Sequence, residues 1–188
     1  MSKDLNYAAL RRNLIALIQE FQVKLGDTRE PIGLYYPAES LNRLLGADLD
    51  AAGLRAALEG FADDARATLG EVSAMAEGGM ICLRVPAEGV AYVQKALPAP
   101  AFLRDFIAAI TRHGLTLDEL RAVFQAYSRN VRVERIDSDE FDYLFYFEDG
   151  EPDDFRYCVR FEGPHAVYHR FTPGDYRALG FPQGTPVE

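Results

Sequence analysis

Aromatic residues recur at every second position in two runs of the C-terminal third, and this alternation constrains the fold more than any other feature of the sequence. The first run spans residues 141–147 and the second spans residues 155–161. Because successive side chains of a β-strand point to opposite faces of the sheet, each run predicts a strand with one buried, aromatic face. Weaker alternation predicts further strands at about 131–136 and 165–171. Short turns separate the four segments, so we expect a four-stranded antiparallel meander.

The first 128 residues follow a different period, in which apolar residues lie three or four positions apart, as on one face of an amphipathic helix. The expected helices cover about residues 4–25 and the segments around Leu41–Leu45, Leu54–Leu69, Val90–Val93, Phe102–Ile110 and Leu120–Tyr127. An extended segment, Ile32–Tyr36, follows the first helix. Gly78-Gly79 predicts a hairpin between residues 71–76 and 80–85.

These patterns predict an α+β fold, with a helical N-terminal two-thirds and a short hairpin packed on the C-terminal four-stranded meander. A chain of 188 residues has the length of one ordinary domain. We therefore expect a single α+β domain over residues 1–188, which is helix-rich over 1–128 and has its antiparallel sheet at 131–171. A terminal helical turn is expected at 173–180, after a capping threonine.

The chain is acidic, with 29 Asp and Glu against 20 Lys and Arg and a formal net charge of −9. The stretch Asp137–Asp154 holds nine acids and no base. Nucleic acids and anionic membranes bind through clustered Lys and Arg, so the charge argues against both as partners. The longest apolar runs have five residues, and the first 30 residues carry no secretory signal. We therefore expect a cytoplasmic protein with reduced cysteines.

The last three strands of the predicted meander have a polar face that carries arginines and tyrosines. If Phe161 pairs with His165, Arg156 lies opposite Arg170, and two like charges in that position are destabilising unless an acid or a bound anion lies between them. This face is therefore a candidate carboxylate or phosphate site, in which the arginines hold the ligand by forked hydrogen bonds. The candidate ligand-binding residues are Arg156, Arg160, Arg170, Tyr146, Tyr168 and His169.

Two interpretations of that face stay open. Pairing Phe147 with Phe155 places Asp142 opposite Arg160, so acids can neutralise the arginines and leave an ordinary solvated face. His169 would act as an acid or base only if its side chain entered the same cavity, and simple alternation places it on the opposite face. This conflict counts against an enzyme.

The remaining motifs predict no metal and no cofactor, and one alternative stays open, which is a single ion held by either acidic turn alone. The acidic turns at residues 137–142 and 149–154 lie at opposite ends of the predicted sheet, over about 20 Å apart, so they cannot share an ion. His165 and His169 are four positions apart on one strand, roughly 13 Å, which is too far for two ligands of one metal. The sequence has no phosphate loop, no dinucleotide-binding fingerprint and no serine-nucleophile motif.

Three segments are similar to one known family. They are Glu30–Gly46, Pro86–Val93 and the longest and most specific, Phe141–Phe181. Together they resemble a bacterial family of small proteins catalogued as a domain of unknown function, number 3877, and the similarity covers nearly the whole chain. The resemblance implies a stand-alone, cytosolic, single-domain bacterial protein without a described activity. It assigns no catalytic or binding residues.

The charge and the predicted sheet lead to two functional hypotheses from different classes. The first is a cytosolic, non-catalytic binding module whose acidic, aromatic-rich sheet docks to a basic protein partner, since complementary charge speeds association. The alternative is a small-molecule binding protein or enzyme that uses the Arg/Tyr face for an anionic ligand. A homodimer surface at Tyr35, Tyr36 and the segment Leu34–Leu45 is a third hypothesis, and the oligomeric state stays open.

Overall fold

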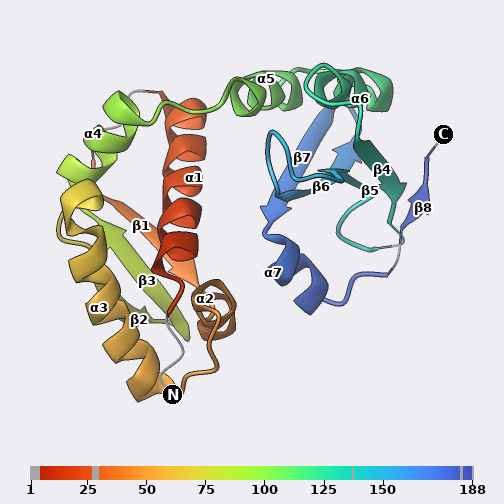
Figure 1. The fold of residues 1–188 in the computed structure, drawn as a ribbon. Helices are drawn as coiled ribbons and strands as arrows, with labels where there is room; N and C mark the ends of the chain where they lie inside the picture. Colours follow the sequence, from red (N-terminus) through yellow and green to blue (C-terminus); the bar gives the residue numbers. More distant parts are fainter. Residues whose placement is uncertain (1–4, 27–29, 137, 183, 188) are drawn as a thin grey trace. The chain divides into compact units, whose positions relative to one another are not determined.

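The computed structural model describes residues 5–26, 30–136, 138–182 and 184–187. The chain has the expected α+β class and divides into two compact units, Met1–Ala99 and Pro100–Glu188. Each unit has its own sheet and its own helices (Figure 1). The organisation of the whole chain as one domain stays a prediction. Within the described ranges, no helix has both the length and the apolar character needed to cross a membrane.

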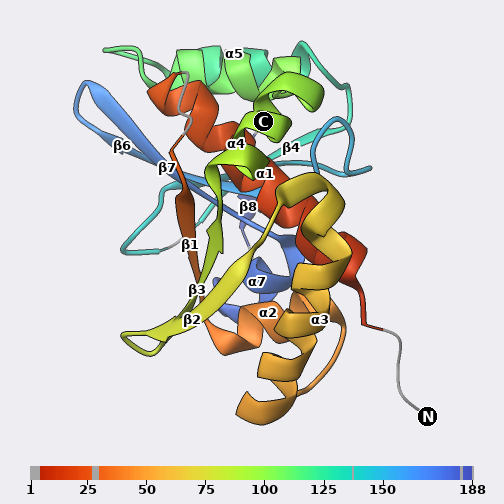
Figure 2. The ribbon, with the colours of Figure 1, turned by 90° about the vertical axis from the view of Figure 1, so that its left-hand side faces the viewer.

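The N-terminal unit combines helices with a three-stranded antiparallel sheet. The helices are α1 (Tyr7–Leu25), α2 (Ala38–Leu45), α3 (Ala51–Leu69) and α4 (Ala87–Ala96). The strands are β1 (Ile32–Tyr36), β2 (Ser73–Glu77) and β3 (Met80–Val85), in the order β1-β3-β2. Figure 2 shows α1 and α3 on one face of this sheet. The helices, the extended segment and the hairpin predicted for this half of the chain are confirmed.

The two tyrosines of β1 have different environments. Tyr36 belongs to the core with Ile32 and Leu34, and its hydroxyl donates a hydrogen bond to Asn13 Oδ1 at 2.8 Å. This bond gives the buried polar groups a partner. Tyr35 points away from the core and is 55% exposed. Only one tyrosine of the predicted dimer surface is therefore accessible, and dimerisation itself stays a prediction.

The C-terminal unit combines helices with a five-stranded antiparallel sheet. Helices α5 (Ala101–Ile110) and α6 (Leu117–Gln125) precede strands β4 (Val131–Arg135), β5 (Tyr143–Phe147), β6 (Arg156–Glu162) and β7 (His165–Phe171). Helix α7 (Pro173–Ala178) and the short strand β8 (Thr185–Pro186) complete the unit. The strand order β7-β6-β5-β4-β8 confirms the four-stranded meander and adds β8 beside β4.

The alternating aromatic residues form the core of this unit together with α5. Phe102 meets Phe147 edge-on with ring centres 4.9 Å apart, and Phe106 meets Tyr157 at 4.7 Å. Edge-to-face pairs of this kind contribute about 0.5–1.5 kcal/mol each beyond the area that they bury. Aromatic packing against α5 therefore determines which face of β5 and β6 points inward.

The predicted register is confirmed between β5 and β6. Phe145 pairs with Tyr157, which is the alignment that follows from pairing Phe147 with Phe155. The two strands carry their aromatic residues in phase, so the rings lie opposite one another on one face of the sheet.

The predicted register is wrong by one residue between β6 and β7. His165 pairs with Glu162 instead of Phe161. Gly163 has a φ of 60° and forms a two-residue turn with Pro164, an arrangement whose twist matches that of a hairpin. The sequence-based alignment required a three-residue turn at this place. A slip of one residue moves every side chain of a strand to the other face of the sheet.

This slip corrects the prediction for β7. Arg170 pairs with Tyr157, so Arg170 and Tyr168 point to the aromatic core and Arg170 does not lie opposite Arg156. His169 points to the other face, which also carries Arg156. The expected separation of His169 from the arginine face is therefore wrong.

Candidate functional site

The face of the C-terminal sheet opposite α5 is covered by α7 and the chain that follows it. Thr172 caps α7, because its hydroxyl accepts a hydrogen bond from the Asp175 backbone N–H at 3.1 Å. Pro173 occupies the first helical position, where its missing N–H costs nothing. A second, smaller apolar cluster lies beneath; it consists of buried Ile136, Leu144 and Cys158, with Phe141, Tyr146, Phe171 and Tyr176 packed against it.

A pocket of about 510 Å³ lies over this cluster, between the sheet and α7, and we call it the α7 pocket. It is lined by Glu134, Leu144, Tyr146, Arg156, Pro173, Tyr176, Arg177, Phe181, Pro182 and Gly184. The lining thus joins an apolar wall of leucine, phenylalanine and prolines to a small number of polar side chains. Ligand sites commonly have this composition, with apolar contact area for the body of the ligand and a few polar groups for its orientation.

Tyr146 connects the acidic and basic sides of the α7 pocket. Its hydroxyl donates a hydrogen bond to Glu134 Oε1 at 2.8 Å, and the Arg156 guanidinium carbon lies 4.2 Å from the centre of its ring. Burial raises the pKa of Tyr146 to about 12, and the hydrogen bond to Glu134 adds to the shift. Tyr146 is therefore neutral at physiological pH and supports Arg156 through a cation–π contact.

Tyr176 comes from α7 and forms the opposite wall. Its ring stacks on Phe181, with ring centres 5.5 Å apart and planes inclined by 29°. Burial raises the pKa of Tyr176 to about 12, so its hydroxyl keeps its proton. The hydroxyl group is thus a neutral hydrogen-bond donor at the edge of an apolar, aromatic surface.

Two arginines determine the charge of the α7 pocket. Arg156 donates to the Asp154 carbonyl oxygen at a long 3.4 Å, and Arg177 lies in the last turn of α7. Among the residues that the structure describes, neither guanidinium has a carboxylate within ion-pair distance. Glu134 is the single carboxylate in the described lining, so two arginines face one glutamate and the pocket is positive in a chain of net charge −9.

The other predicted arginines do not converge on this pocket. Arg160 donates to the Asp139 carbonyl oxygen at 2.8 Å and forms an ion pair with Glu162 at 3.3 Å. Arg170 is buried on the other face, with its Nη1 3.7 Å from Asp153 Oδ2. The predicted three-arginine patch is therefore not formed. The alternative interpretation, in which acids neutralise the arginines on a solvated face, fits Arg160. It does not fit Arg170, because the charge of Arg170 is compensated inside the core.

The last two predicted ligand residues also lie outside the α7 pocket. Tyr168 meets Phe106 edge-on at 4.7 Å, on the aromatic core side. His169 is exposed and stacks on Phe171, with ring centres 4.8 Å apart. Of the six predicted ligand-binding residues, Arg156 and Tyr146 alone line the pocket. The structure therefore brings Arg156 and Tyr146 together at the α7 pocket and places Arg160, Arg170, Tyr168 and His169 elsewhere, and whether any of them binds a ligand stays a prediction.

Sequence reasoning missed four important lining residues, namely Glu134, Tyr176, Arg177 and Phe181. The segment from Pro173 to Phe181 does show apolar and aromatic residues after a helix cap, which could have indicated a packed rather than a solvated terminal helix. No pattern in the sequence states which face of the sheet that helix covers.

The acidic turn at residues 149–154 is partly occupied by internal hydrogen bonds, whereas Asp137 of the other acidic turn lies outside the described residues. Asp149 accepts bonds from Asn130 Nδ2 at 2.7 Å and from the Glu151 backbone N–H at 3.2 Å, and these bonds lower its pKa. Asp153 accepts one from the Phe155 backbone N–H at 2.8 Å. These carboxylates order the β5–β6 connection. No group of three or more His, Cys, Asp or Glu side chains suited to a metal occurs within the described ranges.

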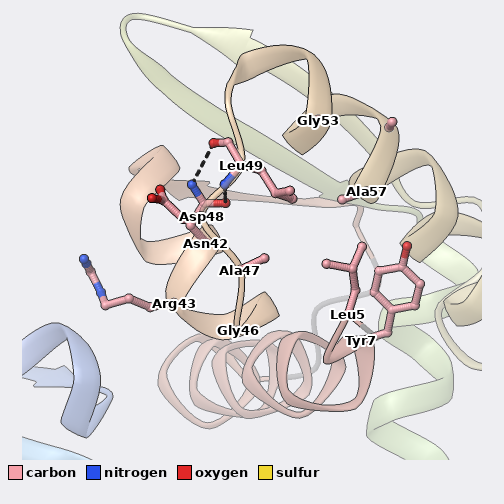
Figure 3. A pocket seen from close by; sticks show the side chains of 11 residues that line it. Leu5, Tyr7, Asn42, Arg43, Gly46, Ala47, Asp48, Leu49, Gly53 and Ala57 are labelled. Atoms are coloured by element: carbon pink, nitrogen blue, oxygen red, sulfur yellow. Dashed lines mark hydrogen bonds between the residues drawn. The ribbon is translucent and has the colours of Figure 1, made fainter. Parts of the chain in front are cut away.

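A larger pocket, of about 810 Å³, lies in the N-terminal unit between the start of α1, the α2–α3 connection and α3 (Figure 3). Asn42 is held by the Leu49 backbone, since its Nδ2 donates to the Leu49 oxygen at 3.0 Å and its Oδ1 accepts from the Leu49 N–H. Figure 3 shows Arg43 pointing away from Leu5 and Tyr7. The charged groups do not converge there, so the α7 pocket is the better candidate site.

Comparison with known proteins identifies a family but no characterised relative. The model of the family described as "Domain of unknown function, E. rectale Gene description (DUF3877)" matches residues 7–180. No curated protein and no solved structure matches the chain. The functional assignment therefore depends on the geometry of the α7 pocket.

Proposed function

The chain belongs to the DUF3877 family, whose description assigns no activity, and we propose from the α7 pocket that it is a non-catalytic, cytoplasmic binding protein. Its C-terminal unit binds a small organic anion, meaning a carboxylate or phosphate joined to a flat apolar group. The acidic group lies against Arg156 and Arg177, and the apolar group lies against Tyr176 and Phe181.

The observation that carries this proposal is the pair of arginines without carboxylate partners among the described residues. A guanidinium group binds carboxylate and phosphate oxygens through two parallel hydrogen bonds, which gives both affinity and orientation. A partly buried pocket strengthens these bonds relative to bulk water. A charge-assisted hydrogen bond contributes about 1.5–3 kcal/mol, which is enough to make binding depend on either arginine.

The apolar wall supports a ligand with a ring or a short apolar chain. Tyr176 and Phe181 form a stacked pair beside Leu144. Aromatic pairs of this kind add contacts beyond simple area burial. The neutral Tyr176 hydroxyl can donate to a ligand oxygen, while Glu134 is already an acceptor for Tyr146.

The surroundings of the α7 pocket favour binding over catalysis. Cys158, in the cluster beneath, is fully buried, and burial raises the pKa of its thiol to about 12. A thiol in that state is not a nucleophile at neutral pH. His169 stacks on Phe171 and is not part of the described lining, and this position supports binding rather than the acid–base role that the enzyme alternative gives it.

The proposal is tested by thermal-shift screening of the purified chain against aryl carboxylates, aliphatic carboxylates and aryl phosphates, followed by calorimetric titration of those that stabilise it. A ligand that binds the folded state raises the unfolding temperature. We expect Arg177→Ala to weaken its binding by tenfold or more, and Arg156→Ala to do the same. Arg160→Ala is the control, because Arg160 lies on the same strand as Arg156 but outside the pocket.

Arg177 is exposed at the end of α7, so Arg177→Ala should fold normally. Absence of stabilisation by every class of anion would reject the proposed function. Binding that is unchanged in both pocket variants would place the ligand elsewhere and reject the α7 pocket.

Docking to a basic protein is the second candidate function. The β5–β6 connection presents exposed acids at Glu148, Asp149, Glu151 and Asp154. Complementary surface charges of this kind attract partners at low salt and are screened at high salt. We expect a specific basic partner to be retained at low ionic strength and released by added salt. Glu151→Gln with Asp154→Asn should weaken retention, whereas Glu59→Gln on α3 should not; equal retention by all variants argues against this surface.

A further inference from the structure

Two histidines from distant parts of the sequence meet in the C-terminal unit. His113 lies in the connection between α5 and α6, and His165 is the first residue of β7. Their ring centres are 5.2 Å apart and their planes are inclined by 87°. The Gly114 backbone N–H donates to the Pro164 oxygen at 2.7 Å, so a backbone hydrogen bond joins the two turns beside the rings.

This separation fits two imidazoles bound to one metal ion. For a metal–nitrogen distance of about 2 Å and tetrahedral coordination, two imidazole ring centres are about 5 Å apart. Both side chains are exposed, so an ion can reach them from solvent. No hydrogen bond or ion pair engages either ring among the described residues. The ring nitrogens are therefore available as ligands.

We propose that His113 and His165 form a site for a divalent transition-metal ion of the Zn²⁺, Ni²⁺ or Cu²⁺ type. Neutral imidazole nitrogens suit these ions, whereas Mg²⁺ and Ca²⁺ require oxygen ligands. Within the described part of the chain no third His, Cys, Asp or Glu completes the group. Water fills the remaining positions, so the ion is exchangeable, as at an open site rather than a closed structural one.

The proposed metal site also predicts an effect of the bound ion on the stability of the C-terminal unit. A bound ion ties the α5–α6 connection to the β6–β7 hairpin, in parallel with the Gly114–Pro164 hydrogen bond. Binding to the folded state alone stabilises it.

The sequence-based prediction contained no histidine metal site because it compared only histidines that are close together in the sequence. His165 and His169 share a strand and cannot reach one ion, while His113 precedes His165 by a long stretch that includes α6 and three strands. The hairpin and the α5–α6 connection meet only after the sheet has formed.

The test is calorimetric titration of the tag-free chain with Zn²⁺ at pH 7.5, together with unfolding temperatures with and without the ion. We expect one Zn²⁺ per chain, a raised unfolding temperature, and at least tenfold weaker binding in His113→Ala and in His165→Ala. His169→Ala is the matched control, because it removes an exposed histidine from the same strand and should leave binding unchanged.

A second readout separates two-histidine coordination from loose surface binding. With Cu²⁺, electron paramagnetic resonance should show coupling to two imidazole nitrogens in the wild type and to one in each single variant. The proposal is overturned if Zn²⁺ does not bind, if His113→Ala or His165→Ala binds as the wild type does, or if His169→Ala weakens binding equally.

Discussion

A buried arginine destabilises a fold unless a carboxylate compensates its charge, and Arg170 is compensated by Asp153. The side chains of Arg170 and Asp153 are 2% and 11% exposed. Tyr157 donates to the same carboxylate oxygen at 2.9 Å, and the Arg170 guanidinium carbon lies 4.4 Å from the centre of the Phe155 ring. The cluster therefore satisfies its members internally, which explains how an arginine enters the aromatic core.

Replacing Arg170 should be the most costly single change among the arginines of β6 and β7. Arg170→Ala leaves the Asp153 carboxylate buried without its positive partner, so we expect a loss of about 3–5 kcal/mol in the free energy of unfolding. Urea unfolding measures this loss. Arg160→Ala is the control, because an exposed ion pair contributes only about 0–1 kcal/mol.

The same variant should show a specific pH dependence. Burial raises the pKa of Asp153, while Arg170 opposes that shift. Without Arg170 the folded-state pKa rises further above the unfolded value, so the folded chain favours the protonated carboxyl. Its contribution to stability is then present at acidic pH and lost as the pH rises through the raised pKa. A loss that is equal at pH 4.5 and pH 7.5, or no larger than that of Arg160→Ala, contradicts this account.

At the scale of the elements, the β6–β7 hairpin decides the composition of both faces of the sheet. Its two-residue turn places His165 opposite Glu162 and thereby sends Arg170 inward. The turn requires a residue at positive φ, and Gly163 meets that requirement with φ of 60°. A Cβ at this position would meet no atom within 4 Å, so only the backbone conformation restricts it.

Substitution of this glycine isolates the backbone effect. Gly163→Ala should lower the free energy of unfolding by about 1–2 kcal/mol, since an L-residue in the left-handed region carries that cost. Gly163→Asn should lose less, because asparagine tolerates this conformation better. Chemical unfolding of both variants provides the comparison. Equal stability of Gly163→Ala and the wild type would show that the turn does not need its positive φ.

At the scale of the whole molecule, each compact unit contains its own core. The larger core cluster lies entirely within Met1–Ala99, and the ring contacts around Phe102 and Phe106 lie entirely within Pro100–Glu188. A unit with a complete core and a paired sheet has the main requirements for independent folding. Each of the two units meets these requirements with its own residues.

A fragment of residues 100–188 is therefore expected to fold by itself. Circular dichroism should show a mixed helix and sheet spectrum, and the fragment should unfold cooperatively in urea. If ligand binding resides in the α7 pocket, the fragment should retain it. A fragment that is unfolded under conditions where the full chain is folded contradicts this expectation and supports the single-domain prediction.

Local sequence patterns predicted most elements of this protein. Helical periodicity and glycine caps located the helices, and aromatic alternation located β5 and β6 and even their register. These features depend on interactions within one element or between neighbouring rows of side chains, so a linear pattern reveals them. Strand β8, with two paired residues, is too short to leave such a pattern.

The tertiary structure alone decided which side chains meet. The β6–β7 turn is one residue shorter than predicted, and this difference places Arg170 in the core and His169 outside it. The packing of α7 brings Arg177 and Tyr176 to the same pocket as Arg156. Linear spacing likewise cannot bring His113 to His165. Contacts between separate elements depend on turn geometry and burial over the whole unit. The alternation of side chains that predicts strand β7 is the same in the predicted and the observed pairing with β6, so it cannot distinguish the two registers. The sequence by itself therefore determined the elements and the inward face of the central strands, whereas the candidate sites exist only because the folded chain brings distant residues together.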